Sequence, residues 1–190
     1  MERKTPLYQT HVDAGGKIVE FGGFLMPVQY PTGVLAEHMA VRQKAGLFDV
    51  SHMGELRLKG PDAVANVQKL ITADISAMRD GDIKYAMFCN DAGGILDDFI
   101  VYRCAADDYW LVVNAGNRDK DAAWVESHLF GDVDYRDEGD DWGQVALQGP
   151  TSGDILKKLC AEQYIPAKYY TFIDNVPLDL GSRTIHALVS

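Results

Sequence analysis

The stretch Asn90-Asp91-Ala92-Gly93-Gly94-Ile95-Leu96-Asp97-Asp98-Phe99-Ile100-Val101-Tyr102 decides the fold of this chain, because it predicts a hairpin on which neighbouring strands can assemble. Its first five residues tolerate positive φ, so the strand before it, 84–89, can fold back onto the strand after it. Side chains alternate along a strand, which puts Asp97 on one face and Asp98 on the other. Both faces are otherwise apolar, and this is typical of a central strand covered on both sides.

Asp97 and Asp98 stand at the beginning of a strand whose neighbours are suited to burial, where an unpaired charge is costly. In one interpretation both carboxylates lie at the solvated end of the hairpin and accept backbone N–H bonds from the turn. In the other, one of them lies in a cleft, where desolvation and a polar ligand tune its pKa for proton transfer or recognition. Two glycines, Gly93 and Gly94, leave room there for a flat ligand.

The composition is that of a soluble globular protein of one or two domains, with 190 residues, 47% hydrophobic and 24% charged. The net charge of -10 argues against sequence-independent binding to nucleic acid or to anionic membranes, because phosphate contacts need Lys and Arg. No apolar run is long enough to span a membrane. Much of the acidity lies in 131–141, which predicts a solvated loop or, as an alternative, a docking face for a basic partner.

Three cysteines, Cys89, Cys104 and Cys160, are widely spaced in apolar runs. They predict buried free thiols in a reducing compartment, and neither they nor the five histidines show a metal-ligand spacing. The first residues lack the features of a signal or transit peptide, so we expect a cytoplasmic protein without a metal site. Ser51 and His52 are expected to make turn hydrogen bonds, because no third member of a hydrolase triad is evident.

The remaining pattern predicts an α+β fold with antiparallel sheets and helices packed on one side. Thr32 is expected to cap a helix that reaches Ala45 and turns Leu35 and Met39 inward. In the alternating strand 54–60, Leu56 is expected to point inward and Glu55 outward. Further strands are expected at 17–21, 24–30, 109–113, 143–150, 169–173, 176–180 and 183–190, and further helices from Pro61, over 118–129 and over 151–161.

Several motifs in the same order and spacing resemble the aminomethyltransferase (T-protein) family of the glycine cleavage system. The resemblance runs from the first residues to the last and rests on 5–8, 21–24, 26–30, 46–53, 94–98, 113–115 and 146–150. It implies an enzyme that takes the aminomethyl group from the lipoyl arm of the H-protein. The one-carbon unit passes to tetrahydrofolate, ammonia is released, and the folate lies in a central channel.

The resemblance also implies roles for individual residues. Asp97, the first of the pair, matches the family's essential aspartate and is expected to orient or proton-couple the folate nitrogen. Met53, Tyr85 and Asn114 match positions that line the folate pocket together with Asp97. General chemistry agrees, because a nitrogen nucleophile that attacks an aminomethyl carbon needs a nearby proton acceptor or charge partner. Core packing is the competing interpretation for Tyr85 and Met53.

Family members continue beyond the strand that matches 183–190 into a pterin-gripping segment and a C-terminal barrel domain, and both are absent here. We therefore expect a truncated folate-binding body, inactive by itself. Residues 1–50 and 140–190 would form an incomplete first subdomain, and 51–139 a second that carries the catalytic hairpin. Two other readings stay open: another folate-dependent one-carbon enzyme, such as a demethylase or the folate module of a sarcosine or dimethylglycine dehydrogenase, and a non-catalytic folate-binding protein.

Overall fold

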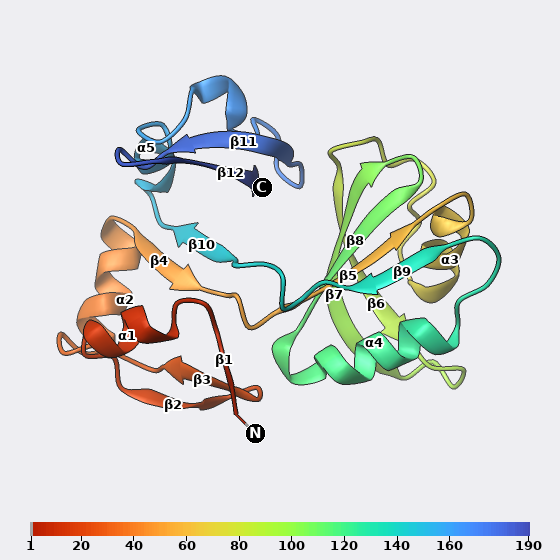
Figure 1. Cartoon of the computed structure of the whole chain (residues 1–190), viewed down its shortest axis with the longest axis horizontal. Coiled ribbons are helices and arrows are strands. Elements are labelled where there is room, and N and C mark those ends of the chain that lie inside the picture. Colours follow the sequence, from red (N-terminus) through yellow and green to blue (C-terminus); the bar gives the residue numbers. More distant parts are fainter. Residues whose placement is uncertain (1) are drawn as a thin grey trace.

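A computed structural model describes residues 2–190 and has the predicted α+β fold (Figure 1). The helices are α1 (Tyr8–Asp13), α2 (Val34–Gln43), α3 (Ala63–Leu70), α4 (Arg118–Ser127) and α5 (Ser152–Leu156), with 3-10 turns η1 (Ala115–Asn117) and η2 (Glu162–Tyr164). The strands are β1 (Arg3–Lys4), β2 (Ile18–Phe21), β3 (Phe24–Pro27), β4 (Gly46–Asp49), β5 (Gly54–Lys59), β6 (Ile83–Cys89), β7 (Ile95–Ala105), β8 (Asp108–Val113), β9 (Asp134–Asp137), β10 (Val145–Gln148), β11 (Ile173–Asp179) and β12 (Thr184–Val189).

The predicted hairpin forms the middle of the largest sheet, whose strand order is β6-β7-β8-β5-β9 with every pair antiparallel. In the hairpin register, Phe88 lies opposite Asp97 and Met87 lies opposite Asp98. Directly opposite residues share a face, so the pair of aspartates is divided between the two faces of the sheet. Because β7 pairs with β6 on one side and β8 on the other, its prediction as a central strand is confirmed.

Both faces of this sheet are covered by apolar side chains. On one face, α3 and α4 pack against the strands, and Val67 and Val125 join Phe99 and Val101 in a fully buried core. The second face carries a smaller cluster of Tyr102, Trp110, Val112 and Phe172. A buried side chain of this size contributes about 1.5–3 kcal/mol through the hydrophobic effect, so the sheet and its two covering layers dominate the stability of this part of the chain.

The acidic stretch 131–141 is not simply a loop, because β9 lies within it. β9 adds to the outer edge of the sheet through β5, with Tyr135 opposite Leu58. Tyr135 packs against the core under the helices, while Asp134 and Arg136 pair with each other on the exposed side. The prediction of a solvated loop is wrong for 134–137. One inward aromatic residue is enough to hold this short strand against the sheet, and its charged residues face solvent along the exposed edge.

α2 is shorter than predicted and uses Gly33, at φ 84°, as its N-cap residue in place of Thr32. The prediction that Leu35 and Met39 point inward is also wrong, since both are exposed and Leu35 keeps 76% of its surface. The apolar spacing did form a helix, but no second layer of the described residues covers that face. Helical periodicity predicts which residues share a face and leaves open what lies against it.

The remaining strands form three smaller sheets, which lie to one side of the main sheet in Figure 1. β1, β3 and β2 form a sheet with one parallel pair, β4 pairs with β10, and β11 pairs with β12. The β4–β10 pair brings 46–49 beside 145–148, which is how two distant parts of the chain meet in Figure 1. The helix expected over 151–161 is shorter, and 169–172 contributes turns and one isolated bridge instead of a strand.

The three cysteines are unpaired, as predicted, but half-buried instead of buried. Cys104 lies beside the smaller apolar cluster, and burial raises the pKa of its thiol to about 12. At neutral pH this thiol is therefore protonated and a weak nucleophile.

Replacement of a core residue of the main sheet tests this arrangement. We expect Leu58→Ala to lower the free energy of unfolding by about 2–5 kcal/mol, because the side chain is fully buried and its removal leaves a cavity. Leu35→Ala is the matched control, and its effect is expected to stay within about 0.5 kcal/mol because the side chain is exposed. Urea unfolding followed by tryptophan fluorescence measures both; equal losses would contradict the described packing.

Candidate functional site

Asp97 lies on the helix-covered face of the main sheet and is only 5% exposed. Its carboxylate accepts hydrogen bonds from Asn114 at 3.3 Å (backbone N–H) and 3.1 Å (Nδ2), and from Asn117 Nδ2 at 2.7 Å. Burial raises the pKa of Asp97, but hydrogen bonds from Asp121, Asn114 and Asn117 outweigh this and hold the pKa below its ordinary value. Asp97 is therefore an ionised group held inside the protein.

Asp98 points to the opposite face and is exposed. The hydroxyl group of Tyr85, on the neighbouring strand β6, donates a 2.8 Å hydrogen bond to its Oδ2. This bond raises the pKa of Tyr85, whose side chain is half-exposed. Asp98 and Tyr85 thus form a polar pair that a ligand can reach from solvent.

The sheet brings three of the four predicted site residues together. Tyr85 lies on the same face as Asp98, and Met53 packs against the apolar cluster of that face. Asn114 follows β8 and connects the two faces, because its Nδ2 donates both to the carbonyl oxygen of Asp98 at 2.7 Å and to the carboxylate of Asp97. The side chain of Asp97 itself points away from Tyr85 and Met53.

A cavity of about 450 Å³ opens beside Tyr85. Tyr169 and Tyr170 are exposed there with their rings 4.7 Å apart, and Lys84 and Lys168 lie at its border. Aromatic faces with nearby cations suit a flat ligand that carries negative charge. The full lining consists of Ala77, Met78, Asp82, Ile83, Lys84, Tyr85, Lys168, Tyr169 and Tyr170.

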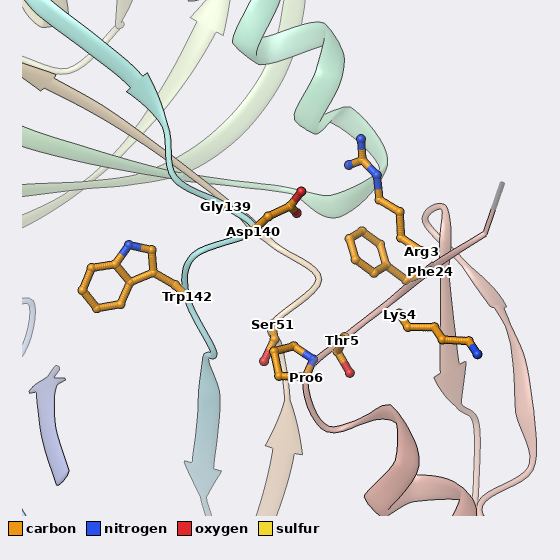
Figure 2. A pocket seen from close by; sticks show the side chains of 9 residues that line it. All are labelled: Arg3, Lys4, Thr5, Pro6, Phe24, Ser51, Gly139, Asp140 and Trp142. Carbon is orange, nitrogen blue, oxygen red and sulfur yellow. The ribbon is translucent and has the colours of Figure 1, made fainter.

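A second cavity, of about 370 Å³, lies beside the N-terminal segment and contains none of the four predicted residues (Figure 2). Phe24 and Ser51 form one part of its lining, and the loop with Asp140 and Trp142 forms another. Ser51 Oγ donates to the carbonyl oxygen of Gln144 and accepts from its N–H, which joins two distant segments. This cavity therefore lies where the N-terminal segment, the bend at Ser51 and the loop 139–142 meet. The turn hydrogen bond predicted here is made by the Ser51 N–H, which donates to Asp49 Oδ1 at 3.0 Å, whereas Nδ1 of His52 has no partner among the described residues.

His52 packs its ring edge-on against Phe21, with 5.6 Å between the ring centroids. Burial lowers the pKa of His52, so the ring is neutral at pH 7. Within 2–190, no group of three or more His, Cys, Asp and Glu residues could hold a metal ion, and no helix has the length and apolar character to cross a membrane.

The prediction that Glu55 points outward is wrong. Glu55 is only 5% exposed, and burial raises its pKa to about 8 even with Arg118 nearby. Arg118 is buried as well and reaches Asp140 at 3.0 Å. Alternation assigns residues to two faces, but it does not say that the second face is solvated.

Sequence reasoning also missed Asp121, which is fully buried on α4 beside Asp97. A signal for it existed, because Asp121 and Val125 are four residues apart and therefore lie on the same helix face. The helix predicted over 118–129 does form, and its apolar side packs Val125 into the core with Ala122 and Leu129 against it.

These features define an α+β body that has a polar and aromatic cavity beside Tyr85 on one face of its main sheet and a buried carboxylate, Asp97, on the other face. The chain belongs to the family described as "GCVT N-terminal domain", which matches residues 7–188.

Several relatives support this assignment. An aminomethyltransferase of Desulfitobacterium hafniense is 48% identical over 187 residues, which cover 96% of this chain and 51% of that protein. One of Desulforamulus reducens is 48% identical and covers 99% of this chain and 50% of its own length. The crystal structure of glycine cleavage system aminomethyltransferase T from Bartonella henselae matches with a TM-score of 0.82 and 35% identity over 92% of this chain and 48% of that one. The chain thus spans about half the length of these relatives.

The division of the two aspartates between the faces can be tested by stability. We expect Asp97→Ala to lower the free energy of unfolding by about 1.5–3 kcal/mol, because it removes a charged acceptor and leaves the Asn114 and Asn117 donors unpaired. Asp98→Ala is expected to cost less than about 1 kcal/mol, since its carboxylate is exposed. Urea unfolding at pH 7 measures both, and a larger loss for Asp98→Ala would refute the assignment of the two faces.

Proposed function

We propose that this chain acts in an aminomethyltransferase of the glycine cleavage system. In this reaction the one-carbon unit of the aminomethyl-lipoyl arm of the H-protein passes to tetrahydrofolate, and ammonia is released. The names of the relatives and the family match support the proposal. The single observation that carries it is the Tyr85–Asp98 pair beside an aromatic, lysine-bordered cavity.

The residues present fit tetrahydrofolate as co-substrate. Its flat ring system matches the exposed faces of Tyr169 and Tyr170, and its carboxylates match Lys168. Tyr85 would hold the ring system together with Tyr169 and Tyr170, and Asn114 would fix the backbone of Asp98 on the neighbouring strand. Met53 lies on the same face of the sheet but outside the lining of this cavity. When bound, the folate supplies the amine nitrogen that accepts the one-carbon unit.

In this proposal, Asp98 is the residue that accepts the proton or orients the amine. Its carboxylate can accept a proton or orient an amine N–H, and the hydroxyl group of Tyr85 holds it in place. Asp97, to which the sequence assigned this role, stays a prediction that none of the comparisons tests. The geometry favours Asp98, because Asp97 is directed toward α4 and has its acceptor positions occupied.

The predicted division into a first subdomain of 1–50 with 140–190 and a second of 51–139 is also a proposal. Two observations support it: the β4–β10 pair joins the two outer parts, and the five-stranded sheet begins at Gly54 and ends at Asp137.

A chimera that joins residues 1–190 to the remaining half of the Desulfitobacterium hafniense relative tests the reaction. We expect 5,10-methylenetetrahydrofolate and ammonia to form from tetrahydrofolate and aminomethylated H-protein. Asp98→Asn is expected to lower kcat by about 10²-fold, the scale of a lost general base, and Asp97→Asn by less. The reverse order would support the sequence-based assignment, and binding of folate without turnover of the wild-type chimera would indicate a non-catalytic folate-binding protein.

The cavity beside Tyr85 can be tested by binding alone. We expect Tyr85→Ala to weaken the binding of 5-formyltetrahydrofolate by up to about 10-fold, because an aromatic contact contributes about 0.5–1.5 kcal/mol beyond burial. Tyr85→Phe keeps the ring face and should stay closer to wild type. Isothermal titration calorimetry measures all three proteins; unchanged affinity of Tyr85→Ala would exclude this cavity as the folate site.

A further inference from the structure

Asp121 is the most unusual carboxyl group near the candidate site, because its side chain is 0% exposed. Neither of its oxygens accepts a hydrogen bond from an N–H or O–H group of the described residues. The polar group within hydrogen-bond reach is the carboxyl of Asp97. Two carboxylates cannot both be ionised at such a distance in a dry environment, so one of them must carry a proton.

Two features act against a proton on Asp121. The ammonium group of Lys120 lies 3.9 Å from Oδ1, and Asp121 belongs to the first turn of α4, where negative charge is favoured. The ammonium group, however, already donates to the carbonyl oxygen of Leu96 at 2.6 Å and to Asn117 Oδ1 at 2.9 Å. It therefore attracts Asp121 only at a distance and supplies no hydrogen bond.

Asp97 is the better place for the negative charge. Its oxygens receive hydrogen bonds from Asn114 and Asn117, whereas those of Asp121 receive none from such donors. Hydrogen bonds to a carboxylate stabilise its charged form, so the proton belongs on Asp121, which then donates to Asp97.

We propose that Asp121 is a positioning residue whose carboxyl group shares one proton with Asp97 and thereby fixes Asn114 and, through it, the backbone of Asp98 at the candidate site. Two links of this chain are hydrogen bonds of the structure, because Asn114 donates to Asp97 and the same amide group donates to the carbonyl oxygen of Asp98. The third link is the fully buried carboxyl of Asp121, which no N–H or O–H donor of the described residues satisfies and which lies beside Asp97. The role of Asp98 in this chain rests on the proposed function, but the shared proton does not.

The pKa directions agree with this geometry. Burial, followed by the hydrogen bond with Asp97 and its charge, raises the pKa of Asp121 from 3.8 to about 8, against the opposing charge of Lys120. The pKa of Asp97 is lowered. The folded protein therefore keeps a proton between about pH 4 and 8 that the unfolded chain has lost, so the free energy of unfolding falls as the pH rises through this window.

Carboxyl ¹³C NMR of the chain tests the shared proton without any ligand. We expect the upper of the pair's two titrations near pH 8, reported by the side-chain carboxyl carbons of both Asp121 and Asp97, because each macroscopic step belongs to the coupled pair. Titration of Asp121 near pH 4 would overturn the proposal. Asp119→Asn, on the same helix turn but with 81% of its side chain exposed, is the control and should leave the pH 8 transition unchanged.

Variants separate positioning from plain packing. Asp121→Asn can still donate a hydrogen bond to Asp97, so it should keep the affinity for 5-formyltetrahydrofolate within about 3-fold. It should also reduce the fall in Tm between pH 6 and 9, and the part that remains comes from Glu55, whose pKa burial also raises to about 8. Asp121→Ala should weaken that affinity by about 10-fold or more at pH 7. Equal effects of both variants on the affinity, or an unchanged dependence of Tm on pH in Asp121→Asn, would contradict the proposal.

Absence of folate binding by the wild-type chain would count against the proposed function. The NMR titration would still decide whether Asp121 and Asp97 share a proton.

Discussion

The structure depends on one constraint, the alternation of side chains along a strand that is paired on both sides. β7 cannot turn Asp97 and Asp98 to the same face, because each residue is fixed by its partner in β6 and the strand is held by β8. One carboxylate must therefore be buried under α4, and the other must face the open side. Hydrogen bonds from Asn114 and Asn117 offset the cost of burying the first.

This constraint explains why buried polar side chains lie on one face of the sheet while Asp98 and Tyr85 lie on the other. The Asp97 carboxylate is held from above by Asn114 and from the helix side by Asn117 and Asp121. Asn114 also donates a hydrogen bond to the carbonyl oxygen of Asp98. This one side chain therefore links the strand that carries Asp98 to the core under the helices. Satisfied polar networks of this kind specify a single arrangement better than apolar contacts do.

The sequence was informative where local chemistry decides the structure. The glycine-containing turn, the central strand and the apolar stripe of α4 were all predictable, since turn residues and periodicity act within a few positions. The exposed face of α2, the edge strand β9 and the burial of Glu55 were not, because each depends on what a distant segment covers. For the site, family resemblance indicated Tyr85, Met53 and Asn114, which the sheet brings together. The resemblance indicated Asp97 as the essential aspartate, whereas the strand register turns Asp97 toward the helices and leaves Asp98 exposed on the other face.

The account is tested most directly by NMR of the chain with labelled aspartate and tyrosine side chains, recorded while 5-formyltetrahydrofolate is added. If the open face binds the ligand, the resonances of Tyr85 and Asp98 shift with saturation, and by more than those of Asp121 under the helix. Large shifts at Asp121 with none at Tyr85 and Asp98 would contradict the division of the two faces.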